Sequence, residues 1–339
     1  MPVGVPRFYV DLRLFLSAVK YFEIPTINRT STLANLPPTN SETFDQWGID
    51  ENGDLSGWHY TEFNTSDIVE AGLEYNYFAA FGHNFADLYD HFTFYPEPAI
   101  NSYDNMLNYS PWGETEYNGW SLATFPLNNV GHTFYLGYPT NSPNPATIPL
   151  KLSSLSVGKY FDMKNAPNLL LTENIEYGGT NEITSYNGSS YSNTMWNKPL
   201  KWGDSLGAWE LEKPNAPQPQ KLSRSGKRSW QLTFSFMDSS DLFGSNQMLT
   251  KYRFDSDDGI DTGDLDDNGF YEKNLLSDEN FFSMWHFTLS GSIPFIFQKN
   301  KDNFDPDGFA MARFREGSLK ATQTAPNLYD ISVTIEETF

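Results

Sequence analysis

Residues 329–336 alternate strictly between apolar and polar side chains. The apolar residues are Tyr329, Ile331, Val333 and Ile335, and the polar residues between them are Asp330, Ser332, Thr334 and Glu336. Successive side chains of a strand point to opposite faces, so this period of two predicts a half-buried strand in an antiparallel sheet. The end of the sequence is therefore predicted to belong to the folded core.

The segment before this strand predicts one helix and two further strands. Ser277 and Asp278 are favourable N-cap residues, and Gly291 is a suitable helix terminator. The apolar residues at helical spacing between them are Phe281, Phe282, Trp285 and Leu289. This pattern predicts a helix near residues 278–290 with one face packed against the rest of the fold. The apolar segments 293–297 and 309–315 each predict a strand.

Other strand patterns occur earlier in the chain. Trp230, Leu232, Phe234 and Phe236 alternate with polar residues, which predicts a second half-buried strand. Residues 77–81 are apolar without interruption, so the strand predicted over Tyr75–Phe85 is expected to be covered on both faces. The segment Phe8–Phe22 fits a strand pattern in its first part and also fits a helix.

Length and composition favour two mainly β domains. A chain of 339 residues exceeds what one core usually organises, and 21 proline and 24 glycine residues indicate short strands joined by long loops. Further strands are predicted at 91–95, 132–137, 154–161 and 169–177. We predict an N-terminal β-sandwich or jelly roll over residues 1–165 and a C-terminal β-rich (α+β) domain over residues 166–339, with one packed helix.

The charge of the chain argues against nucleic acid as a partner. With 43 Asp and Glu against 22 Lys and Arg, the net charge of −21 repels phosphate backbones unless basic residues gather on one face. The absence of cysteine excludes disulfides and thiolate chemistry. Leu14–Val19 is too short to span a bilayer, and no signal-peptide pattern opens the sequence, so we predict neither a membrane span nor secretion by a signal peptide.

The acidic segment 255–272 has the spacing of a short calcium loop. The candidate ligands are Asp264, Asp266, Asn268, Glu272 and the carbonyl of Phe270. Oxygen donors at every second position around Gly269 suit Ca²⁺. Leu275 occupies the position at which an EF-hand places its bidentate glutamate, so a solvated acidic loop is the alternative interpretation.

The sequence contains no catalytic motif. It has neither a Gly-x-Ser-x-Gly elbow nor a glycine-rich phosphate loop with a lysine, so we predict that the protein is not an enzyme. The five histidines, for which we predict structural, hydrogen-bonded roles, are His59, His83, His91, His132 and His286. A carboxylate pair for glycoside hydrolysis stays an alternative without a motif, because 43 acidic residues contain many pairs.

Two groups of residues are candidates for binding. Each has two interpretations. The basic cluster Lys221, Arg224, Lys227 and Arg228 either contacts an acidic face of a neighbouring subunit or belongs to a solvated loop. Trp112 and Trp120 either stack on sugars or pack in the core.

Six segments form a recognisable set when taken together. They are residues 155–171, 224–236, 280–282, 293–298, 305–310 and 325–333. As a set they resemble structural proteins of tailed bacteriophages, especially marine phages, which are similar to minor tail, baseplate or distal-tail components. The resemblance implies a virion protein of the tail that is assembled in the host cytoplasm, forms a ring with copies of itself and contacts other tail or baseplate proteins.

The segment Tyr75–Phe85, with Gly82-His83-Asn84, resembles the core strand of galactose-binding-like jelly rolls carried by phage tail proteins. This resemblance implies an adhesive or interaction domain over residues 1–165, and it assigns no sugar-binding residue. A carbohydrate-binding module that attaches to host surface glycan is one alternative role. A capsid decoration or connector protein is another.

Overall fold

The structure is a computed structural model with a mainly β fold. It describes residues 4–19, 28–29, 45–47, 58–88, 93–97, 105–107, 117–131, 133–139, 150–152, 154–168, 172–176, 180–194, 201–202, 206–207, 211–213, 220–222, 227–243 and 280–338. These residues form one large antiparallel sheet of eleven strands, a four-stranded sheet, four two-stranded sheets and a few short helices.

Ten strands follow one another across the large sheet. Their order is β12 (Thr172–Glu176), β19 (Lys227–Asp238), β23 (Leu328–Glu337), β21 (Phe309–Phe314), β20 (Phe295–Gln298), β1 (Arg7–Asp11), β11 (Ser154–Asp162), β5 (Tyr75–His83), β8 (Gly119–Asn128) and β7 (Asn105–Leu107). The eleventh strand, β22 (Lys320–Ala325), pairs with β23.

The remaining elements are short. The four-stranded sheet has the order β2 (Asn28–Arg29), β4 (Trp58–Asn64), β9 (Thr133–Pro139) and β6 (Thr93–Glu97). The paired strands are β3 (Asp45–Trp47) with β10 (Leu150–Leu152), β13 (Thr180–Thr184) with β14 (Ser190–Thr194), β15 (Lys201–Trp202) with β16 (Leu206–Gly207), and β17 (Leu211–Lys213) with β18 (Gln220–Leu222). The helices are α1 (Leu12–Ala18), α2 (Ser66–Glu70), α3 (Ser239–Leu242) and α4 (Phe281–Phe287), with 3₁₀ turns η1 (Phe85–Leu88) and η2 (Pro306–Gly308).

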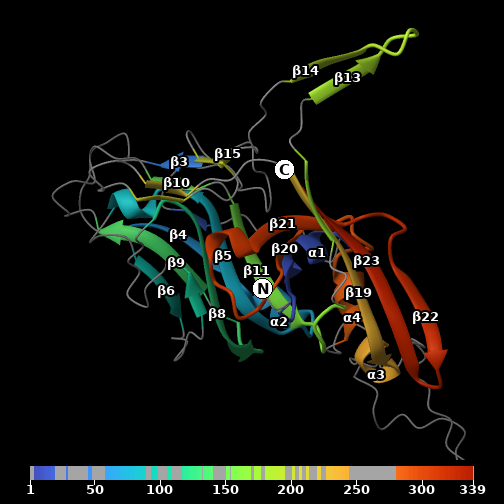
Figure 1. Cartoon of the computed structure of the whole chain (residues 1–339). Coiled ribbons are helices and arrows are strands. Elements are labelled where there is room, and N and C mark those ends of the chain that lie inside the picture. The colour runs from blue at the N-terminus through green and yellow to red at the C-terminus, as the bar shows by residue number, and fades with distance from the viewer. Residues whose placement is uncertain are drawn as a thin grey trace, which may run out of the picture.

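Strand β1 joins the N-terminal and C-terminal parts of the large sheet. Tyr9 is opposite Tyr160 of β11 on one side and opposite Ile296 of β20 on the other. Figure 1 shows β5, β8 and the four-stranded sheet on one side of this junction, and β19, β22 and β23 on the other. Strands from both predicted ranges thus share one sheet, and a division near residue 165 stays a prediction.

The central strands are buried on both faces. Every residue of β5 is buried, as predicted from its uninterrupted apolar run. Phe8 and Phe78 belong to a core cluster on one face, which helices α1, α2 and α4 help to cover, and Tyr9 and Tyr77 belong to a second cluster on the other. Strand β11 approaches β1 so closely that a Cβ on Gly158 would lie 1.9 Å from the Val10 carbonyl oxygen, so only glycine fits there.

The alternating C-terminal pattern forms strand β23, as predicted. Ile331, Val333 and Ile335 are fully buried. Strand β19 begins with the predicted alternation, but the prediction is wrong at Phe236, whose side chain is 73% exposed. A bulge between Phe234 and Met237 shifts the register by one residue, so Met237 takes the buried position instead.

The predicted helix is present but shorter than expected. Asn280 caps α4 by accepting a hydrogen bond from the Ser283 backbone N–H at 2.9 Å, and residues 277–279 lie outside the described part of the chain. The helix ends at Phe287, because Leu289, Ser290 and Gly291 have left-handed backbones with φ of 47°, 59° and 91°. The packed face of α4 is confirmed, but its buried large residues are Phe281, Met284 and Phe287. The other predicted stripe residues, Phe282, Trp285 and Leu289, are only half-buried against the same core.

Segment 8–22 contains both predicted alternatives in succession. Its first residues form β1, and Asp11 then ends the strand and caps α1 by accepting a hydrogen bond from the Leu14 backbone N–H at 2.9 Å. The strands predicted at 75–85, 91–95, 132–137, 154–161, 169–177, 293–297 and 309–315 are present, with shifted boundaries, as β5, β6, β9, β11, β12, β20 and β21.

Candidate functional site

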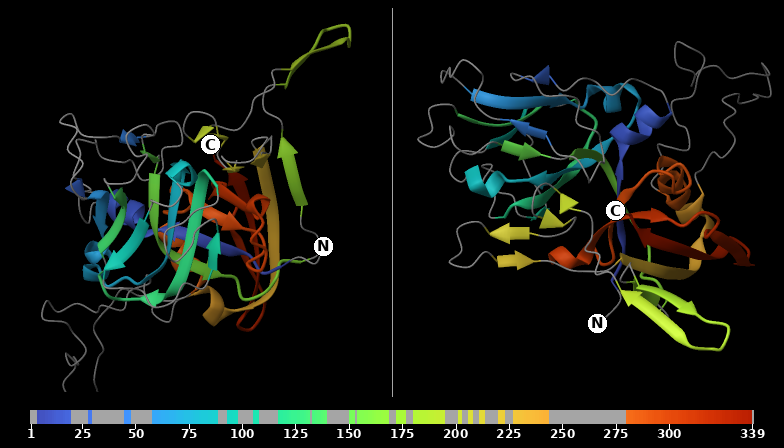
Figure 2. Two further views of the ribbon diagram at one scale, coloured as in Figure 1. Left: turned by 90° about the vertical axis from the view of Figure 1, so that its left-hand side faces the viewer. Right: turned by 90° about the horizontal axis from the view of Figure 1, so that it is seen from above.

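A hairpin formed by β13 and β14 projects from the body of the protein. Ser185 and Gly188–Ser189 close its turn, with Ser185 N–H donating to the Ser189 carbonyl at 2.8 Å and Gly188 N–H to the Ser185 carbonyl at 2.8 Å. Gly188 has a φ of 80°, which glycine adopts without strain. Figures 1 and 2 show the hairpin extending away from the sheets.

The hairpin exposes its larger side chains to solvent. Ile183 and Tyr191 are directly opposite each other and are 68% and 65% exposed, and Tyr186 in the turn is fully exposed. Within the described residues, the two strands pair with each other alone. A two-stranded hairpin without a covered face is only marginally stable in water. The hairpin would therefore gain stability if another surface packed against it.

Strands β12 and β22 of the large sheet each have an open edge. Strand β12 pairs with β19 and contains two glutamates, Glu173 and Glu176. Strand β22 pairs, within the described chain, only with β23, and five of its six residues are exposed. Unpaired N–H and C=O groups along such edges can accept another strand.

The bulge in β19 holds Phe236 in an unusual conformation. Its φ is 58°, and its backbone N–H donates to the Asp330 carboxylate at 3.1 Å. A left-handed backbone is rare for an aromatic residue and costs about 1–3 kcal/mol. The side chain is exposed, so its own burial does not offset this cost.

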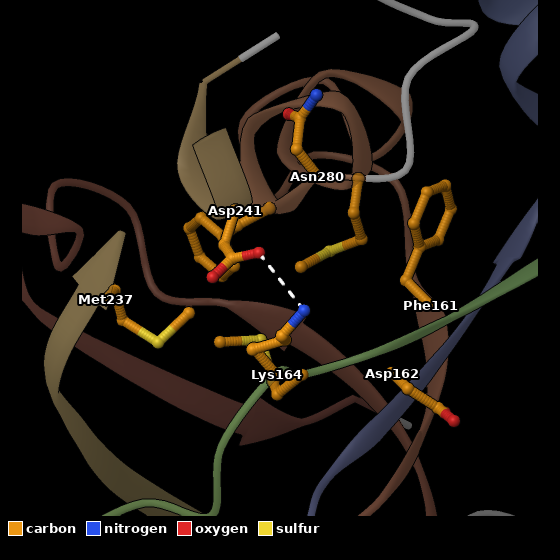
Figure 3. A pocket seen from close by; sticks show the side chains of 9 residues that line it. Phe161, Asp162, Lys164, Met237, Asp241 and Asn280 are labelled. Carbon is orange, nitrogen blue, oxygen red and sulfur yellow. Dashed lines mark ion pairs between the residues drawn. The ribbon is translucent and has the colours of Figure 1, made fainter. Parts of the chain in front are cut away.

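A pocket of about 220 Å³ opens between β11, β19, α3 and α4. Its lining is mixed: the apolar residues are Phe161, Met163, Met237, Phe281 and Met284, and the polar residues are Asp162, Lys164, Asp241 and Asn280. Figure 3 shows Lys164 and Asp241 pointing toward one another, with 3.6 Å between Nζ and Oδ1, whereas Asp162 points away. The ion pair between Lys164 and Asp241 is partly exposed to solvent and therefore weak. This mixed lining assigns no ligand to the pocket.

The buried ionisable groups Asp11 and His83 have structural roles. Burial raises the pKa of Asp11 to about 6 and lowers the pKa of His83 to about 3, so His83 is neutral at physiological pH. The His83 Nε2 lies 2.8 Å from the Ser121 hydroxyl, and its ring stacks on Phe85 at 3.9 Å. His83 thus has the predicted structural role, and His286 is an exposed residue of α4.

The basic cluster divides between the surface and the interior. Lys227 is exposed, Arg224 and the side chain of Lys221 lie outside the described residues, and Arg228 is buried. The Arg228 guanidinium lies 3.1 Å from the Glu337 carboxylate and donates to the carbonyls of Asp307 and Phe309. Arg228 therefore fits neither predicted alternative, since it ties β19 to the C-terminal strand. Sequence reasoning missed this pair because its partners are 109 positions apart.

The predicted calcium ligands, Asp264, Asp266, Asn268, Phe270 and Glu272, lie outside the described residues. Among the residues that are described, no group of three His, Asp or Glu side chains is arranged to hold a metal ion. Trp112 also lies outside the described residues. Trp120 is buried in the second core cluster against Phe309, so it packs in the core instead of stacking on a sugar.

Comparisons with protein-family models, curated protein sequences and solved structures find no match to this chain. Over its described part, the fold contains no helix long and apolar enough to cross a membrane.

Proposed function

We propose that this chain is a non-enzymatic structural protein of a tailed-bacteriophage virion, placed at the distal tail or baseplate, where copies assemble into a ring. The observation that carries the proposal is the projecting β13–β14 hairpin with its exposed Ile183, Tyr186 and Tyr191. Such a hairpin gains stability when a neighbour covers it, which suits an assembly arm. The resemblance of residues 155–339 to phage tail proteins points to the same role.

The side chains of the arm suit a protein contact. Ile183 and Tyr191 lie on one face of the hairpin, and burying an aliphatic side chain of this size contributes about 2 kcal/mol. Tyrosines such as Tyr186 combine a large apolar ring with a polar end and are common anchors of interfaces. Residues 183–192 carry no charge, so covering them removes no charged group from water.

The proposal also includes a division of the chain into two domains. Residues 1–165 would form a galactose-binding-like β-sandwich that decorates the tail or binds a ligand, and residues 166–339 would form the assembly domain. The four-stranded sheet beside β5 and β8 supports the sandwich interpretation (Figures 1 and 2). A capsid decoration or connector protein belongs to the same structural class and differs in its location in the particle. Trp120 is buried and Trp112 lies outside the described residues, so neither tryptophan supports carbohydrate binding as a second candidate.

The role of the arm is tested by substituting its apolar face. We expect the wild-type chain to form a discrete oligomer in size-exclusion chromatography with light scattering, and the double variant Ile183→Ser/Tyr191→Ser to shift toward the monomer mass. Val130→Ser is the matched control, because Val130 is also an exposed apolar residue, 51% exposed, and lies outside the hairpin. A wild-type chain that stays monomeric at high concentration, or a double variant with unchanged mass, would contradict the proposal.

The location is tested separately in particles that contain this protein. Cryo-electron microscopy should place a closed ring of copies at the distal end of the tail. Density for the chain on the capsid would move the protein to the decoration or connector alternative. Its absence from purified particles would exclude a virion role.

A further inference from the structure

We propose that the open edge of β22 receives strand β14 from a second copy of this chain. The inference rests on the proposed assembly role of the hairpin and names the surface on which the hairpin docks. It describes strand addition, in which backbone hydrogen bonds join an incoming strand to the edge of a sheet.

Of the two open edges near β19 and β23, the charges favour β22 over β12 as the receiving strand. Exposed edges usually carry charges that prevent strand addition. Strand β12 contains Glu173 and Glu176 within five residues, whereas β22 has one charge, Lys320, at its first position and five uncharged residues after it. Strand β14 contains no charged residue. An uncharged strand can therefore approach an edge with no negative charge, in a chain whose net charge is −21.

The faces of the two elements also match. Ala321 of β22 is opposite the buried Ile331 of β23, so Ala321 lies on the core side of the sheet although it is exposed. Leu319, just before the strand, is partly buried against the same core. A strand added at this edge extends that apolar face, because directly paired residues point to the same side.

Strand β14 can supply the missing side chains. Placing Tyr191 on the core side also places Ile183 there, since these two residues are directly opposite in the hairpin. Ser190 and Ser192 then fall on the outer side, next to Thr322. One alignment thus covers the two exposed apolar side chains of the hairpin strands and leaves the serines in solvent.

Within one chain the two elements lie apart, so we assign the docking to a second copy. In Figure 1 the hairpin extends beyond the top of the molecule, whereas β22 runs to its lower edge. Each chain therefore offers one arm and one edge that do not meet each other. Contacts of this head-to-tail type close into a ring when the rotation between copies permits.

The absence of native cysteine makes disulfide cross-linking a clean test. Full-length chains with Ser190→Cys or Ser192→Cys are mixed with a size-tagged full-length chain carrying Thr322→Cys, and then mildly oxidised. Paired residues of adjacent strands lie within the Cα separation that a disulfide bridges. Thr184→Cys is the matched control, because Thr184 lies directly opposite Ser190 on β13 and would be one strand farther from β22, beyond the reach of a disulfide. We expect at least one serine position to cross-link to the tagged chain about tenfold more than Thr184→Cys does.

A second measurement does not depend on cysteine geometry. Thr322→Asp adds a negative charge to the proposed receiving edge, and Thr172→Asp adds the same charge to the edge of β12 as a control. We expect the first variant to weaken self-association about tenfold, and the second to leave it unchanged. Circular dichroism verifies that both variants are folded.

The outcomes separate this inference from the proposed function. Equal cross-linking at all three positions, or no cross-linking to Thr322→Cys, would overturn the assignment of β22. If Ile183→Ser/Tyr191→Ser still lowers the oligomer mass in that case, the hairpin is an assembly arm that docks elsewhere. If the double variant also keeps the wild-type mass, both proposals fail.

Discussion

The buried carboxylate of Asp11 makes the stability of this fold depend on pH in a specific direction. Burial raises the pKa of Asp11 from 3.8 to about 6, although the hydrogen bond from the Leu14 N–H and the charge of Arg13 lower it. Because each pKa unit corresponds to about 1.4 kcal/mol, the ionised side chain destabilises the folded state by about 3 kcal/mol. The folded state therefore binds this proton more tightly than the unfolded chain does.

The sign of the effect follows from this difference in proton affinity. Below pH 3.8 Asp11 is neutral in both states and contributes no cost. As the pH rises from 3.8 to about 6, the unfolded state ionises first, so the free energy of unfolding falls. Above that range the cost is constant. Asp11→Asn keeps the side-chain oxygen that caps α1 and removes the titration.

Guanidinium unfolding of wild type and Asp11→Asn tests this reasoning. The free energy of unfolding of the variant minus that of wild type should increase by about 3 kcal/mol between about pH 3.5 and about pH 7.5. Comparing the two pH values removes any pH-independent cost of the substitution. A difference that stays constant over this range would refute the reasoning.

Asp238 provides a matched control. It is also an N-cap residue, of α3, but it is exposed, and the backbone hydrogen bond from Ser240 lowers its pKa. Asp238→Asn should therefore lose stability relative to wild type as the pH rises through the acidic range, which is the opposite sign. The same direction of change for both variants would mean that a global charge effect, and not the burial of Asp11, controls the result.

Three further substitutions test the packing. Gly158→Ala should destabilise the fold by about 2 kcal/mol or more, measured by urea unfolding, because its Cβ would clash with the Val10 carbonyl oxygen; an unchanged midpoint would contradict this. Glu337→Gln should cost about 3–5 kcal/mol in the same assay, since it leaves the buried Arg228 guanidinium without its counter-charge, and a loss below 1 kcal/mol, the level of a surface pair, would count against it. Phe236→Gly should raise the melting temperature, because glycine tolerates the φ of 58° and the lost side chain is exposed; a lower melting temperature would show that the phenylalanine ring packs favourably.

The strands with clear side-chain periodicity could be predicted from the sequence. Strands β5 and β23 follow from the pattern of apolar residues, because burial of one or both faces selects side chains at a fixed period. The apolar spacing from Phe281 onward predicted α4 in the same way, although its observed cap is Asn280 and not the predicted Ser277 or Asp278. The exposure of Phe236 could not be predicted, because a bulge inserts one extra residue and no side chain in β19 marks its position.

The candidate site was less accessible to sequence reasoning. The hairpin residues alternate Ile, Thr, Ser and Tyr around an Asn-Gly turn, which is a recognisable hairpin signal, but the pattern does not show that the hairpin leaves the body. The ion pair of Arg228 and Glu337 was also hidden, because a charged residue at a strand terminus usually faces solvent.

The sequence by itself determined the local elements of this protein, its mainly β class and its acidic, cysteine-free surface chemistry, because these depend on side-chain period and composition. Only the tertiary structure decided which strands are neighbours. Strand β1 lies between β11 and β20, and its partner β20 is almost the whole chain away from it in sequence. Backbone hydrogen bonds are the same for every pair of strands, so the partner is selected by how all faces are buried together, and the same selection leaves the β13–β14 hairpin and the edge of β22 uncovered.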